Sequence, residues 1–235
     1  MGLADISSFV VCYLVPFGRE RPIAAMVHPM SMRSWPMGGW MRRLGAIPST
    51  YEDAEATLRG GTPVLVFPGG DHEAGRPIWE ASQVQFAGRK GFLKIARHAG
   101  VPIVPMGIRG SHYTAPVLWR SDWLLPRLLV LPHLAGIKRY PLTVLGVAGV
   151  VALAWFGPIL NWWVTLVLAW LWLILPLNQV PWVPWSVRIT IGQPLQPEDL
   201  FDGEGEALDS AYERVEGAVQ AIVSAERGRP ALTNG

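Results

Sequence analysis

The segment from residue 67 to residue 77 holds the densest group of side chains that could do chemistry. It reads Phe67-Pro68-Gly69-Gly70-Asp71-His72-Glu73-Ala74-Gly75-Arg76-Pro77. Its glycines let the main chain approach a ligand closely, and it follows an apolar run typical of a buried strand. The glycine spacing resembles that of a phosphate loop, but Arg76 and Pro77 stand where that loop needs Lys and Ser or Thr. We therefore interpret the segment as a binding loop of a different kind.

Other familiar catalytic and metal-binding patterns are absent from the sequence. There is no Gly-x-Ser-x-Gly turn to supply a serine nucleophile, and no pair of histidines has metal-ligand spacing. We expect most histidines to be surface or hydrogen-bonded residues without a catalytic role; they are His28, His72, His98, His112 and His133. The single cysteine, Cys12, lies in an apolar run, so we expect a buried thiol and neither a disulfide nor a zinc site.

The elements around the segment predict an α/β fold. Apolar runs indicate buried strands at residues 63–67, 101–108 and 187–192. Apolar residues at helical spacing predict helices at residues 88–99 and 206–226, and a short helix closed by Gly60 and Gly61 is expected at residues 52–58. Strands alternating with helices are typical of one α/β domain, and 235 residues suit a single domain over 1–235.

A hydrophobic insert interrupts this pattern at residues 140–187, which contain no Asp, Glu, Lys or Arg. The run Leu142–Leu160 is long enough to cross a hydrocarbon core of about 30 Å, so we predict a membrane-spanning helix there. The shorter run Trp162–Leu175 suits an interfacial or re-entrant segment, and a soluble buried hairpin is the alternative for both runs. Cationic residues on both sides of the insert predict that its two ends face the cytosol.

The overall composition agrees with contact between this chain and membrane lipids. Half of the residues are hydrophobic, 16% are charged, and there are 12 Trp, a residue that favours membrane–water interfaces. The formal net charge of +2 is too small to indicate binding to nucleic acid. We therefore expect membrane lipids as partners and no nucleic acid.

Four sequence pieces together resemble a known family. They are Leu44-Gly45-Ala46-Ile47-Pro48, Phe67-Pro68-Gly69-Gly70 with Glu73, Val101-Pro102-Ile103-Val104-Pro105, and residues 187–194. Their order and spacing resemble the glycerolipid acyltransferases of the 1-acylglycerol-3-phosphate acyltransferase superfamily. The resemblance implies a glycerol-phosphate acyltransferase-like α/β fold, a mixed sheet flanked by helices. It also implies transfer of a fatty acyl group from acyl-CoA or acyl carrier protein to a glycerolipid or lysophospholipid hydroxyl, at the cytosolic membrane face and without a metal or bound cofactor.

The family's catalytic signature is a histidine followed, after four residues, by an aspartate that orients it as a base. None of the five histidines has an aspartate at that spacing. Asp5 begins Asp-Ile-Ser-Ser-Phe, which is similar to the residues that follow the signature, and its histidine would fall one position before Met1. We therefore expect a chain truncated at its start, with Asp5 as the remaining catalytic residue. The alternatives are a natural pseudoenzyme and, for Asp5 itself, a helix N-cap.

The resemblance also implies the residues that bind substrate. They are Phe67, Pro68, Gly69, Gly70, Glu73, Arg76, Pro102 and Pro105. The Phe-Pro-Gly-Gly form resembles the diacylglycerol acyltransferase-like branch, which makes a neutral glycerolipid acceptor credible, because Gly69 and His72 replace the Glu and Arg of the phosphate-binding form. Arg76, Arg89 or Lys90 could still meet a phosphate or the CoA pyrophosphate. The rival interpretation is a membrane-anchored binding or scaffold protein that keeps the fold without the chemistry.

Overall fold

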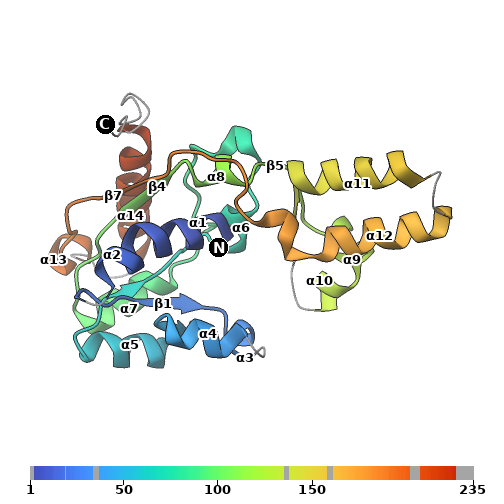
Figure 1. Ribbon diagram of the computed structural model, residues 1–235. Coiled ribbons are helices and arrows are strands. Elements are labelled where there is room, and N and C mark those ends of the chain that lie inside the picture. Colours follow the sequence, from blue (N-terminus) through green and yellow to red (C-terminus); the bar gives the residue numbers. More distant parts are fainter. Residues whose placement is uncertain are drawn as a thin grey trace.

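The chain folds into an α/β body from which a helical hairpin projects (Figure 1). This computed structural model describes residues 3–18, 20–33, 37–134, 138–157, 161–201 and 207–225. The body contains both chain ends of the described part, and the hairpin is formed by residues in the second half of the sequence. The predicted α/β class is confirmed.

The N-terminal segment is helical and covers one side of the body. It consists of α1 (Leu3–Phe9), a π-helical turn (Val10–Leu14) and α2 (Val15–Phe17). Phe9 is buried and stacks on Tyr13, with 5.1 Å between the ring centroids. Cys12 lies on the opposite, exposed side, so the expectation of a buried thiol is wrong. An apolar run in a surface helix buries only one face, and Cys12 is on the other.

A three-stranded parallel sheet with the order β2-β1-β3 lies next to the N-terminal helices. Its strands are β1 (Ala24–Val27), β2 (Ala46–Pro48) and β3 (Val64–Leu65). The connecting helices are α3 (Pro29–Arg33), α4 (Met37–Arg43) and α5 (Tyr51–Arg59). Thr50 caps α5, because its Oγ1 accepts a hydrogen bond from the Asp53 main-chain N–H at 3.2 Å.

The remaining strands form two antiparallel pairs instead of joining this sheet. One pair is β4 (Met106–Arg109) with β7 (Arg188–Ile191), and the other is β5 (Val117–Ser121) with β6 (Tyr140–Thr143). In the described part of the chain, the predicted single mixed sheet is therefore three small sheets. The predicted strand at residues 101–108 pairs regularly only from Met106 onward. Pro102 and Pro105 have no N–H to donate to a ladder, which explains the late start.

The main core lies between three helices of the body. They are α7 (Gly91–Ala99), α13 (Pro197–Leu200) and α14 (Ala207–Ala225). The fully buried Leu93 of α7 packs in one cluster with Phe86, Leu200, Ala211 and Val215. Helix α14 also fixes the loop before α7, since Glu216 Oε1 accepts from the Phe86 N–H at 2.8 Å. The predicted helices at 88–99 and 206–226 are confirmed apart from their ends.

The hairpin is built from the hydrophobic insert. It consists of α11 (Val144–Phe156) and α12 (Trp162–Ile174), with α9 (Leu124–Leu129) and α10 (Leu131–Leu134) beside its base. The prediction of a spanning helix at 142–160 is not supported by the described residues, and its last three residues, 158–160, lie outside them. The first two residues of the predicted span belong to β6, and Thr143 then starts α11, because its Oγ1 accepts from the Gly146 N–H at 2.9 Å. Helix α11 has 13 residues, about 20 Å of helix.

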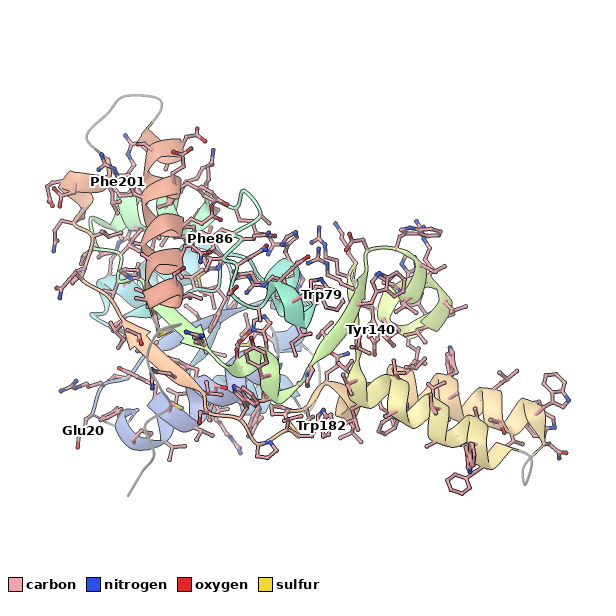
Figure 2. The ribbon with its side chains drawn as sticks, turned by 90° about the horizontal axis from the view of Figure 1, so that it is seen from above. Glu20, Trp79, Phe86, Tyr140, Trp182 and Phe201 are labelled. Carbon is pink, nitrogen blue, oxygen red and sulfur yellow. The ribbon has the colours of Figure 1, made fainter. Side chains whose placement is uncertain are left out.

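Within the residues that the structure describes, no helix is both long and apolar enough to cross a membrane. The alternative of a buried hairpin is wrong, because apolar side chains along both helices face outward. Trp155 and Trp162 are 80% and 75% exposed. Figure 2 shows the hairpin extending away from the body beyond Tyr140.

Hydrogen bonds hold the base of the hairpin. The buried Asn178 donates through Nδ2 to the carbonyls of Trp172, Leu173 and Leu175, at 2.9, 3.1 and 2.8 Å. The main-chain carbonyl of Asn178 accepts from Thr143 Oγ1 at 2.7 Å. The bonds from Nδ2, together with one from the Tyr140 hydroxyl to the Leu173 carbonyl, pair carbonyls at the end of α12, where a helix has no further N–H of its own to offer. The hairpin is therefore anchored to β6 at its base.

Candidate active site

A cavity of about 660 Å³ lies inside the α/β body. Its walls come from α1, from β3 and the segment that follows it, from β4 and β7, and from α14. Most lining side chains are apolar, among them Phe9, Val66, Ile103, Ile191 and Val215. This size and lining are typical of a site for a small apolar or amphipathic ligand.

Four ionisable side chains lie at one part of this wall: Asp5, Glu73, Arg76 and His112. Asp5 comes from α1, and His112 comes from the short helix α8 (Ser111–Thr114), against which α1 packs. Glu73 comes from the single-turn helix α6 (Asp71–Ala74), and Arg76 follows it. The Asp5 carboxylate acts electrostatically on the pKa of each of the other three groups. Segments more than 100 residues apart in sequence thus form one polar cluster.

Glu73 is held in place by the loop around it. Its Oε1 accepts from the Gln85 N–H at 3.1 Å and lies 3.8 Å from Arg76 NH2. The Glu73 side chain occupies the position that a Cβ on Gly69 would need, so a larger residue at position 69 would displace it. Burial raises the pKa of Glu73, while Arg76 and the Gln85 N–H lower it; the net direction is upward.

Arg76 is 5% exposed and incompletely paired. Apart from its long contact with Glu73, the guanidinium has Nε and NH1 buried without a hydrogen-bond partner among the described residues. Burial lowers the pKa of Arg76, and the carboxylates of Glu73 and Asp5 oppose that shift. Arginine stays charged in proteins, so two buried donors remain available for an oxygen atom of a ligand.

His112 is the second incompletely paired group of the polar cluster. Its Nδ1 lies 3.4 Å from Ser111 Oγ, and its buried Nε2 has no hydrogen-bond partner of good geometry in the described part of the chain. Burial lowers the pKa of His112, and the positive charge of Arg76 lowers it further. The Asp5 carboxylate and a hydrogen bond with the main chain of Glu73 raise it. The net direction is downward, which favours the neutral imidazole at pH 7.

The structure brings together most of the site residues predicted from the sequence. Those that line the cavity are Asp5, Phe67, Pro68, Glu73, Arg76, Pro102 and Pro105. Asp5 lies in the first turn of α1, so the N-cap alternative is wrong. Gly69 and Gly70 are not lining residues: Gly69 makes room for Glu73, and the Arg89 guanidinium lies where a Cβ on Gly70 would be.

Two further basic residues had been considered as phosphate ligands, and neither lines the cavity. Arg89 lies over Gly70, and Lys90 forms an ion pair with Asp209. The sequence interpretation also missed His112, which it grouped with histidines of no catalytic role. Its position could have indicated a role in the site, because His112 follows Gly110 just beyond the carboxyl end of the strand predicted at 101–108. Among the described residues, no group of three or more His, Cys, Asp or Glu could hold a metal ion.

Comparison with known proteins gives a family for part of the chain. Residues 9–109 match the model of the family described as Acyltransferase. This range contains Glu73 and Arg76, while Asp5 and His112 lie just outside it.

The chain is also similar to mycobacterial proteins that are described as uncharacterized. One from Mycobacterium leprae is 31% identical over 134 residues, which are 57% of this chain and 36% of that protein. Relatives from Mycobacterium bovis and Mycobacterium tuberculosis are each 33% identical over 117 residues, which are 50% of this chain and 32% of theirs. The matches thus span about a third of these relatives. No solved structure matches the chain. Residues 9–109 are therefore similar to the acyltransferase family, which makes acyl transfer the general activity to consider for this region.

Proposed function

We propose that the protein transfers a fatty acyl group from a thioester, acyl-CoA or acyl carrier protein, to a hydroxyl of a glycerolipid or lysophospholipid. The observation that carries this proposal is the cavity, which joins an ionisable cluster to a mainly apolar lining. An acyl thioester has the matching two parts, a polar reacting carbonyl and an apolar chain. The alternative of a scaffold without chemistry does not explain the unpaired polar atoms buried in this wall.

The donors of Arg76 suit the thioester carbonyl. When a hydroxyl attacks this carbon, negative charge develops on the carbonyl oxygen, and buried donors stabilise it more than water does. The Nε and NH1 atoms of Arg76 are buried donors without a protein partner in the described part of the chain. Glu73 keeps the guanidinium near this position through their 3.8 Å contact. We therefore propose that Arg76 stabilises the oxyanion. Glu73 would position Arg76 and the acceptor.

The charge of the polar cluster supports an acceptor without a phosphate group. Among the described residues that line the cavity, two carboxylates, Asp5 and Glu73, lie with one guanidinium, Arg76, and His112 favours its neutral form; the charge of Arg120, which also acts on Arg76, comes from outside the lining. A phosphate would meet both carboxylates and only one guanidinium, which is unfavourable in a buried site. A neutral glycerolipid hydroxyl avoids this repulsion.

An assay of the full-length native protein, purified from its own start codon, in mixed micelles tests the activity. Radiolabelled palmitoyl-CoA would be supplied with monoacylglycerol, diacylglycerol or lysophosphatidic acid, and labelled products would be separated by thin-layer chromatography. We expect transfer to the neutral acceptors. We further expect Glu73→Gln to lower kcat about tenfold or more, because it loses the charge that holds Arg76. Glu198→Gln, an exposed carboxylate in α13, is the matched control and should keep the activity. Absence of transfer to every acceptor, from palmitoyl-CoA and from palmitoyl-acyl carrier protein, would contradict the proposal.

We also propose that the protein acts at the cytosolic face of a membrane, where the hairpin α11–α12 enters one leaflet without crossing the bilayer. Residues 140–187 carry no charge, and outward-facing apolar side chains occur on both helices. Their length of about 20 Å exceeds the half-thickness of a hydrocarbon core of about 30 Å but not its full thickness. The exposed Trp155, Trp162 and Trp163 lie where α11 ends and α12 begins. Burying these surfaces in lipid would remove them from water.

Flotation with liposomes checks this membrane contact. We expect the wild-type chain to float with phosphatidylcholine vesicles and the triple variant Val151→Glu, Trp155→Glu, Leu166→Glu to stay at the bottom, because charges in the hydrocarbon region are costly. The control is Trp79→Glu, which alters an exposed apolar residue of the body and should leave flotation unchanged. A wild-type chain that forms a dimer in sedimentation experiments and does not float would show instead that a second copy covers the hairpin.

A further inference from the structure

We propose that α9 and α10 bind the headgroup layer of a membrane that contains anionic phospholipid. This inference rests on the membrane contact proposed for the hairpin, and it adds a second contact surface and the class of lipid. Both helices lie beside the base of the hairpin (Figure 1). A hairpin that enters one leaflet from the end where α11 meets α12 leaves its base, and therefore α9 and α10, at the level of the lipid headgroups.

One side of α9 is fixed to the hairpin. The buried Leu125 and Leu129 of α9 pack in one cluster with Tyr140. Trp170 of α12 packs against this cluster. Where α9 begins, Ser121 Oγ accepts a hydrogen bond from the Leu125 N–H at 3.0 Å. The helix therefore presents its other side to the surroundings in a fixed orientation.

That other side, continued by α10, is an exposed apolar surface. Its large apolar side chains are between 45% and 73% exposed: Trp123, Leu124, Leu128, Val130, Leu131 and Leu134. We call these six residues the α9–α10 surface. Exposed apolar patches of this kind mark binding surfaces for proteins or lipids. Trp is favoured where hydrocarbon meets water, and Leu is favoured just beneath the headgroups.

The charged residues in this part of the chain are mainly basic. Residues 120–139 contain four basic residues and one acidic residue, Asp122. Asp122 Oδ1 lies 3.4 Å from Arg120 Nε and 3.3 Å from Arg139 Nε. Two guanidinium groups thus compensate the carboxylate, and the segment keeps a positive charge.

The other two cations, Arg127 and Lys138, are exposed. The guanidinium carbon of Arg127 lies 5.6 Å from the centre of the Trp123 ring, so this cation accompanies the α9–α10 surface directly. Lys138 lies shortly before β6, which packs beside α9. Cations of this kind reach lipid phosphates while neighbouring apolar groups lie beneath them. The combination therefore suits anionic phospholipid.

A second copy of the chain suits the α9–α10 surface less well than lipid. In a two-fold dimer the same surface of each copy meets the other. Arg127 and Lys138 would then lie in an interface whose other half carries the same positive charges, which is unfavourable. An anionic lipid surface attracts both cations instead.

Flotation of the full-length native protein with two kinds of vesicle tests the inference. One kind is phosphatidylcholine alone, and the other contains about 30% phosphatidylglycerol. We expect the wild type to bind the anionic vesicles about tenfold or more tightly, because each Lys or Arg near an anionic surface contributes about fivefold. The double variant Arg127→Gln, Lys138→Gln should lose about tenfold in affinity for the anionic vesicles and keep the wild-type affinity for phosphatidylcholine.

The matched control is the double variant Lys94→Gln, Arg97→Gln. Both residues are exposed on α7, which lies in the body away from the hairpin (Figure 1). The control removes the same two charges, and Arg97 also lies over an aromatic ring, that of Phe201, at 6.0 Å. It should bind both kinds of vesicle as the wild type does.

A fluorescent label measures whether the α9–α10 surface itself enters the lipid interface. In a Cys12→Ser background, which lacks the single natural cysteine, Leu128→Cys would carry an environment-sensitive nitrobenzoxadiazole group. Lys94→Cys would carry the control label. We expect a brighter, blue-shifted emission from position 128 when anionic vesicles are added, and an unchanged emission from position 94.

The outcomes distinguish this inference from the proposal on the hairpin. If the protein floats with neither kind of vesicle, both are overturned. If it floats with phosphatidylcholine but gains nothing from anionic lipid, or if the variant at positions 127 and 138 binds like the wild type, only the inference on α9 and α10 is overturned. A label at position 128 whose emission shifts with protein concentration in the absence of vesicles would show a second copy on this surface, which also overturns it.

Discussion

Replacement of Arg76 by methionine should lower kcat of acyl transfer by about 10²–10³-fold, the cost of removing an oxyanion donor in other acyl-transfer sites. Methionine keeps much of the side-chain volume but removes every donor. The guanidinium is buried and its Nε and NH1 have no partner among the described residues, so solvent cannot replace them easily. The measurement is kcat and KM separately. Loss of a transition-state interaction lowers kcat, whereas loss of ground-state binding alone raises KM.

Two further variants make this result specific. Arg76→Lys keeps a charge but has a different donor geometry, and it should recover only part of the rate. Arg59→Met removes another arginine that pairs with a glutamate, but its side chain is 72% exposed, and its activity should equal that of the wild type. An Arg76→Met enzyme with the wild-type kcat would exclude Arg76 from the reaction and leave its donors without an explanation.

The second large effect concerns stability. Gly110→Ala should lower the free energy of unfolding by about 3 kcal/mol or more, because two penalties combine. Gly110 has φ +94°, which L-residues rarely adopt, and a Cβ there would collide with the main-chain oxygen of Ser186. Backbone atoms cannot rotate aside as the end of a side chain can. Urea denaturation followed by circular dichroism measures the change.

Gly61→Ala is the matched control for Gly110→Ala. Gly61 has a similar φ of +79°, but no atom lies within 4 Å of the position of an added Cβ. It should therefore cost only the conformational penalty, about 1–2 kcal/mol. If both variants lose the same free energy of unfolding, the collision of the added Cβ at position 110 with Ser186 does not contribute to the destabilisation. Because Gly110 also starts the turn that carries His112, the folded fraction of Gly110→Ala should have reduced activity.

Local sequence patterns were enough to predict the helices of the body. The spacing of apolar residues predicted α7 and α14, and the glycines that follow residue 59 indicated where α5 ends. A helix buries one face, and that face leaves a period of 3.6 residues in the sequence whatever it packs against. The glycine-rich loop at residue 67 was likewise recognisable, because its residue types follow from the turn it makes.

The strands and the insert were predicted less well, because their limits depend on partners. The hydrophobic run at residues 101–108 predicted one continuous strand, but Pro102 and Pro105 shorten it. Strand β4 also pairs with β7, which lies more than 75 residues away in the sequence. In the insert, Leu142 and Thr143 pair with β5, which takes them out of the helix. The absence of charge identified the segment as unusual, but the pairing of β5 with β6 determined where α11 begins.

The sequence by itself determined the α/β class, the body helices and a minority of the residues of the cavity wall, because each of these leaves a local pattern or a family motif. Only the tertiary structure decided that His112 belongs with Asp5, Glu73 and Arg76, and that Cys12 does not lie inside. Asp5 and His112 are far apart in the chain and meet because α1 packs on α8. Such a contact results from the burial of whole helices, and no spacing of residues along the chain records it.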